Sequence, residues 1–103
     1  MGMTLGERVR ATVAALMQIT GETQADLAAA LGVSQTQLSR RQSGSAAWSL
    51  DDCDTLAAHY GLDVLDLLAG PTRACELLPA ARRRRPVTGR KATGVAAGKE
   101  AAR

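Results

Sequence analysis

Aromatic residues are almost absent from this chain. Its 103 residues contain no Phe, one Trp and one Tyr, which make up 2% of the total. Hydrophobic residues still account for 46%, so the interior has to be built from Leu, Val and Ala. Such a composition suits helices better than sheets, which favour β-branched and aromatic residues. The sequence therefore predicts an all-α protein.

Long apolar runs are lacking as well. No stretch approaches the roughly 18 apolar residues of a membrane-spanning helix. The N-terminus has no basic segment followed by an apolar stretch and a cleavage site. A chain of 103 residues has room for one small domain and a tail. We expect a soluble, cytoplasmic protein with no membrane partner.

Candidate metal ligands and nucleophiles are few. The chain has two cysteines, Cys53 and Cys75, and a single histidine, His59, which make neither a disulfide framework nor a metal-ligand cluster. We expect Cys53 in the core, Cys75 partly buried and His59 at the surface. No nucleophile turn or spacing typical of a catalytic triad occurs. The sequence predicts no metal, no cofactor and no enzymatic activity.

Charge divides the chain into two parts. Residues 1–70 carry four Arg against eight acidic residues, a net charge of −4, whereas residues 71–103 carry nine Lys or Arg against two Glu, a net charge of +7. The second part is short of large apolar residues after residue 79 and cannot offset the entropy of ordering its backbone. We expect a folded domain over 1–70 and a basic, flexible tail over 71–103, with a possible short helix at 72–78.

Start and stop signals predict five helices in the folded part. Each begins with a capping Thr, Ser or Asp that is followed three residues later by an acid or an amide. The expected helices cover about 4–18, 23–31, 34–43, 49–60 and 63–69. The segment from Met17 to Glu22 lies between the first two helices, and it predicts either a longer first helix or a longer loop.

The second and third helices are joined by a very short corner. Gly32 can take the left-handed conformation that ends a helix, and Val33 is placed to pack onto Leu38 across the Ser34 cap. Leu38 faces inward, which leaves the polar residues of the third helix on its outer face. Gln and Arg side chains pair bidentately with adenine and guanine edges in the major groove of DNA. The corner therefore favours a helix-turn-helix that binds DNA.

The segment T-Q-x-D-L-A-x-x-L-G-V-S-Q-x-x-L-S-R, from Thr23 to Arg40, resembles the lambda-repressor-like (Cro and phage-repressor) helix-turn-helix family. The resemblance extends over about residues 4–70 and implies a five-helix domain that binds double-stranded DNA. It implies that the third helix, called the recognition helix below, contacts bases through Gln35, Thr36, Gln37 and Arg40. Phosphate contacts would come from Gln24, Ser34, Ser39, Arg41 and Ser43.

Two departures from the family lie around the end of the recognition helix. Relatives often pair an Arg on the first helix with a Glu at this end, and this chain has Val13 and Gln42 instead, so no buried charge is stranded. Arg41 and Trp48 stand where relatives commonly have a large apolar residue and a Pro. We hypothesise that Trp48 supplies the missing apolar bulk, while Arg41 lies over its ring or turns to a phosphate.

These features favour a sequence-specific transcription regulator, a small repressor of phage or plasmid type. Small domains of this kind bind palindromic operators as dimers, so we expect a homodimer, formed through the fifth helix and residues 72–78. The alternative is a protein-interaction module, such as an antitoxin or an anti-repressor partner, that docks through acidic fourth and fifth helices.

The basic tail also has two interpretations. It is either a phosphate-binding arm or merely a solubilising extension. Electrostatic attraction to phosphates supplies most non-specific DNA affinity, and the domain itself is acidic, which favours the arm. Its contacts would come from Arg82, Arg83, Arg84, Arg85, Arg90 and Lys91.

Overall fold

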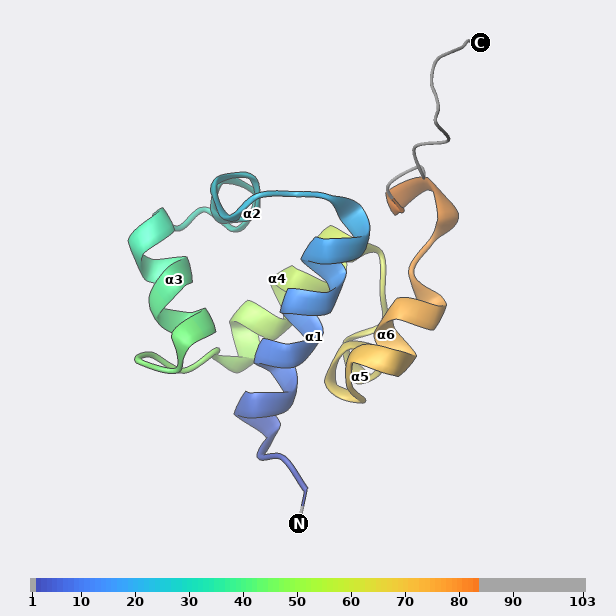
Figure 1. Ribbon diagram of the computed structural model, residues 1–103, viewed down its shortest axis with the longest axis horizontal. Coiled ribbons are helices and arrows are strands. Elements are labelled where there is room, and N and C mark those ends of the chain that lie inside the picture. Colours follow the sequence, from blue (N-terminus) through green and yellow to red (C-terminus); the bar gives the residue numbers. More distant parts are fainter. Residues whose placement is uncertain (1, 84–103) are drawn as a thin grey trace, which may run out of the picture.

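The computed structural model describes residues 2–83, which form a bundle of short helices (Figure 1). Within this range there are six α-helices, one 3-10 turn and no strand, which confirms the all-α prediction. The elements are α1 (Leu5–Thr20), α2 (Gln24–Leu31), α3 (Gln35–Ser43), α4 (Leu50–Tyr60), α5 (Val64–Leu68), α6 (Pro71–Leu77) and the turn η1 (Ala80–Arg82).

Side-chain caps begin the first four helices as the sequence predicts. Thr4, Thr23, Ser34 and Ser49 each make both hydrogen bonds of a capping box with the residue three positions on. The fifth helix also begins at its predicted cap, Asp63, but without a capping box. Asp63 accepts a hydrogen bond from the backbone N–H of Leu65 at 2.8 Å, while Asp66 pairs with Arg73 of α6 at 3.3 Å.

The central element is α1, which packs against α3 on one side and against α5 and α6 on the other (Figure 1). It continues to Thr20, two residues beyond the expected end, so the segment before α2 lengthens the helix. Side chains from α1, α2, α3, α4 and α5 meet in one core. Its largest fully buried members are Val9, Thr12, Val13, Leu16, Leu27, Leu38, Leu56, Tyr60 and Leu67.

The bundle extends beyond the expected boundary at residue 70. Pro71 takes the first position of α6, where its missing N–H is no loss. Ala74 and Leu78 are 0% and 4% exposed, and α6 packs along α1. The short helix expected at 72–78 therefore belongs to the folded domain rather than to the tail, and the bundle has six helices where the sequence predicted five.

The cysteines lie where they were expected. Cys53 is buried and Cys75 half-buried, and both are free thiols. Burial raises the pKa of each thiol, so neither carries the thiolate character of a reactive cysteine. Between residues 2 and 83 no helix combines the length and hydropathy needed to cross a membrane.

Candidate nucleic-acid interface

The corner between α2 and α3 is short and closely held. Only residues 32–34 separate the two helices. Gly32 adopts a φ of 73°, which L-residues with a side chain rarely take, and the backbone N–H of Val33 donates to the carbonyl of Ala28 at 3.0 Å. Leu27 and Leu38 are fully buried on either side of the corner. The two helices are therefore presented as one rigid unit.

The start of α2 is held by its capping box. The hydroxyl of Thr23 accepts from the backbone N–H of Asp26 at 3.1 Å, and the carboxylate of Asp26 accepts from the N–H of Thr23 at 2.9 Å. This second bond holds the pKa of Asp26 below its ordinary value. The bond to the carboxylate is therefore fully formed at neutral pH and weakens as pH falls through the lowered pKa, whereas the bond to the Thr23 hydroxyl does not titrate.

Polar side chains from both helices line one open groove. Its volume is about 340 Å³, and it is bordered by Gln24, Gln35, Thr36, Ser39 and Arg40. These residues come from the N-terminal end of α2 and from the first two turns of α3. Both helix N-termini meet at the groove, and the partial positive charge of their free N–H groups favours anions. The structure thus brings together three of the four expected base contacts and two of the expected phosphate contacts.

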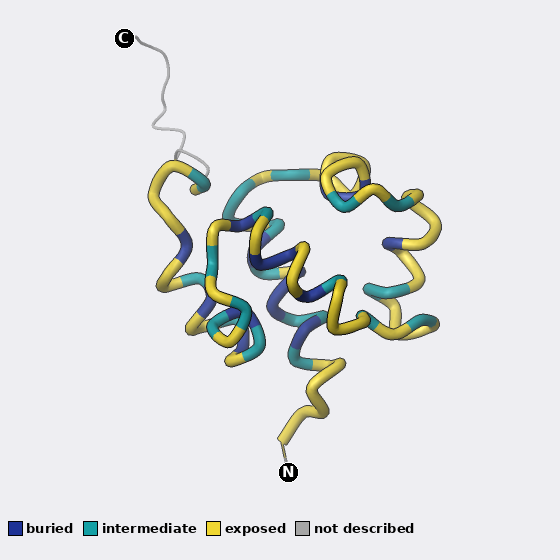
Figure 2. The backbone as a smooth tube through the Cα atoms, turned by 180° about the vertical axis from the view of Figure 1, so that it is seen from behind, coloured by how far each residue is buried: buried dark blue, intermediate teal, exposed yellow. Residues whose placement is uncertain are grey.

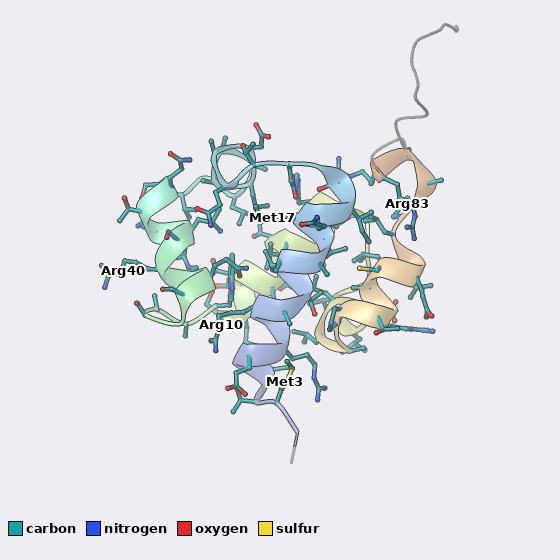
Figure 3. The ribbon with its side chains drawn as sticks, in the orientation of Figure 1. Met3, Arg10, Met17, Arg40 and Arg83 are labelled. Atoms are coloured by element: carbon teal, nitrogen blue, oxygen red, sulfur yellow. The ribbon has the colours of Figure 1, made fainter. Side chains whose placement is uncertain are left out.

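Arg40 supplies the formal positive charge at this groove. Its side chain is exposed and extends away from the body of the domain (Figure 3). No acidic side chain between residues 2 and 83 pairs with it in an ion pair. A guanidinium that is exposed and uncommitted can make two hydrogen bonds to a base edge or to a phosphate.

Gln37 is the expected base contact that does not line the groove. Its Oε1 atom accepts from the backbone N–H of Ser34 at 2.9 Å, and the Ser34 hydroxyl accepts from the N–H of Gln37 at 3.1 Å. Both side chains therefore cap α3. The amide group of Gln37 retains its N–H donors for other partners.

The remaining expected phosphate contacts lie at the other end of α3. The hydroxyl of Ser43 donates to the carbonyl of Arg40 at 3.1 Å. Arg41 turns toward the body of the domain, where its Nε atom lies 3.2 Å from a carboxylate oxygen of Asp52. A phosphate contact by Arg41 would require it to leave this partner.

The hypothesis that Arg41 lies over Trp48 is confirmed. The guanidinium carbon is 5.7 Å from the centroid of the indole ring, within the range of a cation–π contact. Trp48 is half-buried and packs against the core. It therefore supplies apolar bulk beside Arg41, as we hypothesised from these two departures from the family.

Sequence reasoning missed the role of Gln42. Its Nε2 atom donates to the backbone carbonyl of Arg10 in α1 at 3.2 Å, and its Oε1 atom accepts from the indole N–H of Trp48 at 3.0 Å. The signal was present in the sequence, because Gln42 replaces a residue that relatives use in a pair with the first helix. Its second partner, Trp48, could not be read from that replacement.

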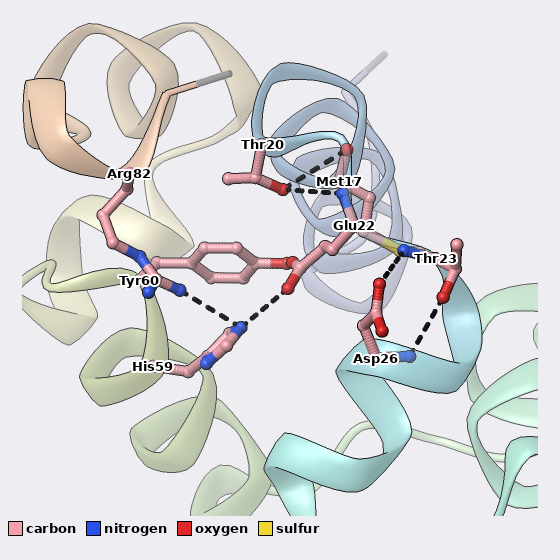
Figure 4. Close-up of polar contacts among 8 residues, drawn as sticks. All are labelled: Met17, Thr20, Glu22, Thr23, Asp26, His59, Tyr60 and Arg82. Carbon is pink, nitrogen blue, oxygen red and sulfur yellow. Dashed lines mark hydrogen bonds and ion pairs between the residues drawn. The ribbon is translucent and has the colours of Figure 1, made fainter. Parts of the chain in front are cut away.

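His59 and Arg82 lie in a polar cluster that includes Glu22 (Figure 4). The Nε2 atom of His59 is 2.9 Å from a carboxylate oxygen of Glu22 and 3.3 Å from the guanidinium of Arg82. The hydroxyl of Tyr60 donates to the other oxygen of Glu22. His59 was expected at the surface, and its ring is half-buried. Both contacts are made by the same ring nitrogen, which donates to Glu22 in one tautomer and accepts from Arg82 in the other.

The expected tail contacts are not brought to the groove. Arg82 is held in the cluster just described, and Arg83 lies at the opposite end of the molecule from Arg40 (Figure 3). The guanidinium of Arg83 donates to the carbonyl of Cys75. The other expected contacts, Arg84, Arg85, Arg90 and Lys91, lie outside the described residues.

The geometry agrees with the comparison to protein families. Residues 21–67, from the end of α1 to α5, match the family model described as Helix-turn-helix. The chain therefore carries a lambda-repressor-like helix-turn-helix domain, the DNA-binding module of a class of transcription regulators. No curated protein and no solved structure matches the chain.

Proposed function

We propose that this protein is a sequence-specific regulator of transcription that acts in the cytoplasm on double-stranded DNA, as a small repressor of phage or plasmid type. The observation that carries the proposal is the groove at the α2–α3 corner. All five residues that border it are among those expected to contact DNA. An α-helix with such an outer face fits the major groove, which is about 12 Å wide.

In this proposal side chains of α3 contact the bases, while neighbouring side chains bind phosphates and fix the position of the domain along the DNA. Gln35, Thr36 and Arg40 approach base edges from the groove, and Gln37, in the first turn of the same helix, offers its free N–H donors. Phosphates are held by Gln24 at the positive end of α2, with Ser34, Ser39, Arg41 and Ser43 around α3. Contacts to phosphates position the domain, whereas contacts to bases carry the specificity.

The regulator is proposed to bind as a homodimer. One small domain contacts too little DNA to be selective, and two copies on a palindrome double the interface. The proposed interface between the two copies is α5 together with residues 72–78. Leu65 in α5 and Leu77 in α6 support it, because their side chains are 72% and 41% exposed in the single chain.

The second candidate is a protein-interaction module, such as an antitoxin or an anti-repressor partner. It is favoured by α4, which exposes Asp51, Asp54 and Leu50, the last with 75% of its surface accessible. An acidic helix with an exposed leucine is suited to a basic protein partner. In that case the polar face of α3 has no function in reading bases.

Two alanine variants separate these functions. Gln35→Ala and Arg40→Ala should each cost about 1 to 3 kcal/mol of specific DNA affinity if α3 reads bases. Gln18→Ala, at an exposed position of α1, is the matched control and should bind as the wild type does. Fluorescence anisotropy with a duplex selected by the wild-type protein provides the measurement. Equal affinities for all three variants would contradict the regulator and favour the interaction module.

A further inference from the structure

Apolar packing alone does not fix the direction of α3. Leu38 is its one fully buried residue, and a helix held at one point can still pivot about that point. Gln42 lies four residues further on and therefore on the same face of the helix. An anchor at Gln42 gives α3 the second fixed point that its direction requires.

The amide of Gln42 provides this anchor through both of its ends. It donates to the carbonyl of Arg10 and accepts from the indole N–H of Trp48, at 3.2 and 3.0 Å. A carbonyl can only accept and an indole N–H can only donate, so a single orientation of the amide satisfies both partners. Because Arg10 belongs to the central helix α1, the end of α3 is fixed relative to the core.

Trp48 is itself held from a second direction. The guanidinium of Arg41 lies over its ring and pairs with Asp52, whose carboxylate also accepts from the backbone N–H of Ser49 at the start of α4. The last turn of α3 is thus joined to α1 through Gln42 and to α4 through Arg41. The indole ring contacts both of these side chains, Gln42 through its N–H and Arg41 through its face.

We infer that Gln42 and Trp48 are positioning residues for DNA recognition, which set the direction of α3 without touching DNA. This inference rests on the proposed function. Gln35 and Arg40 are five residues apart, roughly 7.5 Å along the helix at 1.5 Å per residue, and Leu38 lies between them. A tilt about Leu38 moves the two base-reading side chains in opposite directions, while the overall attraction to phosphates is hardly altered.

The first test compares two identical changes. Gln42→Leu keeps the size of the side chain and removes both hydrogen bonds, and Gln18→Leu makes the same change at an exposed position of α1. Each variant is titrated with the duplex selected by the wild type and with a scrambled duplex, at a temperature where circular dichroism shows it to be folded. Gln42→Leu should lose about tenfold in affinity for the selected duplex, or about 1.4 kcal/mol, and nothing for the scrambled one. Gln18→Leu should bind both duplexes as tightly as the wild type does.

A second variant tests the connection between the two residues. Trp48→Phe keeps an aromatic ring and removes the N–H donor, so it should also weaken binding to the selected duplex. Because both changes break the same bond, the double variant should lose less than the sum of the two single losses. Losses that simply add would overturn the inference.

Trp48 also reports on the anchor without DNA. It is the only Trp in the chain, so the emission spectrum belongs to this residue alone. Gln42→Leu should shift the emission, because the indole loses its partner, and Gln18→Leu should leave it unchanged. An unshifted spectrum for Gln42→Leu would contradict the bond on which the inference depends.

The failures of the inference and of the proposed function are distinguishable. If the wild-type protein binds selected and scrambled duplexes equally, the proposed function fails and the inference fails with it. If the wild type discriminates and Gln42→Leu discriminates equally well, only the positioning role is overturned.

Discussion

The hydroxyl of Tyr60 donates a hydrogen bond to the carboxylate of Glu22, 38 residues earlier in the chain. Tyr60 is fully buried at the end of α4, and Glu22 lies in the short connection between α1 and α2 (Figure 4). The pair therefore connects the segment that precedes α2 to the end of α4. In contrast to the buried Tyr60, α3 is exposed along most of its length (Figure 2).

Removal of this hydroxyl should weaken the fold. Tyr60→Phe keeps the buried ring but takes a partner from Glu22, and it should lower the free energy of unfolding by about 1 to 3 kcal/mol, as expected for a bond to a charged group. Urea denaturation of both proteins measures the difference. The control is Thr55→Val, which removes a hydroxyl from an exposed position of the same helix and should change stability by less than about 0.5 kcal/mol. Equal losses for the two variants would contradict a specific role of the pair.

Alkaline pH should destabilise the protein through the same residue. Burial, followed by the hydrogen bond to Glu22, raises the pKa of Tyr60 above its ordinary value, which is about 10 in an unfolded chain. The folded state therefore keeps a proton that the unfolded state releases, so the stability it contributes is complete below about pH 10 and is lost as pH rises further. Tyr60 is the only Tyr in the chain, so tyrosinate absorbance should increase together with unfolding. Ionisation near pH 10 with the helices intact would refute this prediction.

Dimerisation can be tested with two equally exposed leucines. Leu65→Lys places a charge in the proposed interface on α5 and should give a monomer in analytical ultracentrifugation. Leu50→Lys makes the same change at the start of α4 and should leave the dimer intact, since the exposed fractions of the two side chains are 72% and 75%. A dimer that survives Leu65→Lys, or is lost only with Leu50→Lys, would place the interface elsewhere.

The basic tail is best tested by truncation after Arg83. A cut after Gly70 would also remove the buried Ala74 and Leu78. A loss of DNA affinity could then not be separated from a loss of folding. Residues 84–103 carry six Lys or Arg and one Glu. If these cations bind phosphates, the shortened protein should bind selected and scrambled duplexes more weakly by the same factor. The slope of log affinity against log salt should become shallower by about 0.9 for each phosphate that the tail neutralises in the full-length protein. Unchanged affinity at low salt would favour the solubilising interpretation.

Local signals in the sequence were sufficient for most of the fold. The four capping boxes and the Gly32 corner depend on residues within a few positions of one another, so they can be read directly from the chain. The polar side chains of the groove followed from the face opposite Leu38 together with the family resemblance. These predictions needed no knowledge of how distant segments pack.

The features that were missed depend on long-range contacts. The sequence predicts a possible short helix at 72–78 that touches the bundle. It does not indicate that this helix packs along α1, because the complementary surface lies about sixty residues earlier in the chain. The cluster of Glu22, His59 and Arg82 joins three separate segments. The ion pair of Arg41 with Asp52 likewise required the fold before it could be recognised.

Selection of duplex DNA from a random pool tests the central claim most directly. If α3 reads bases as part of a homodimer, the full-length protein should enrich duplexes that share a palindrome, with half-sites about one helical turn, or roughly 10 base pairs, apart. Arg40→Ala should enrich sequences with relaxed preference at one position of each half-site. A pool that remains unenriched after repeated rounds with the folded wild-type protein would contradict the account.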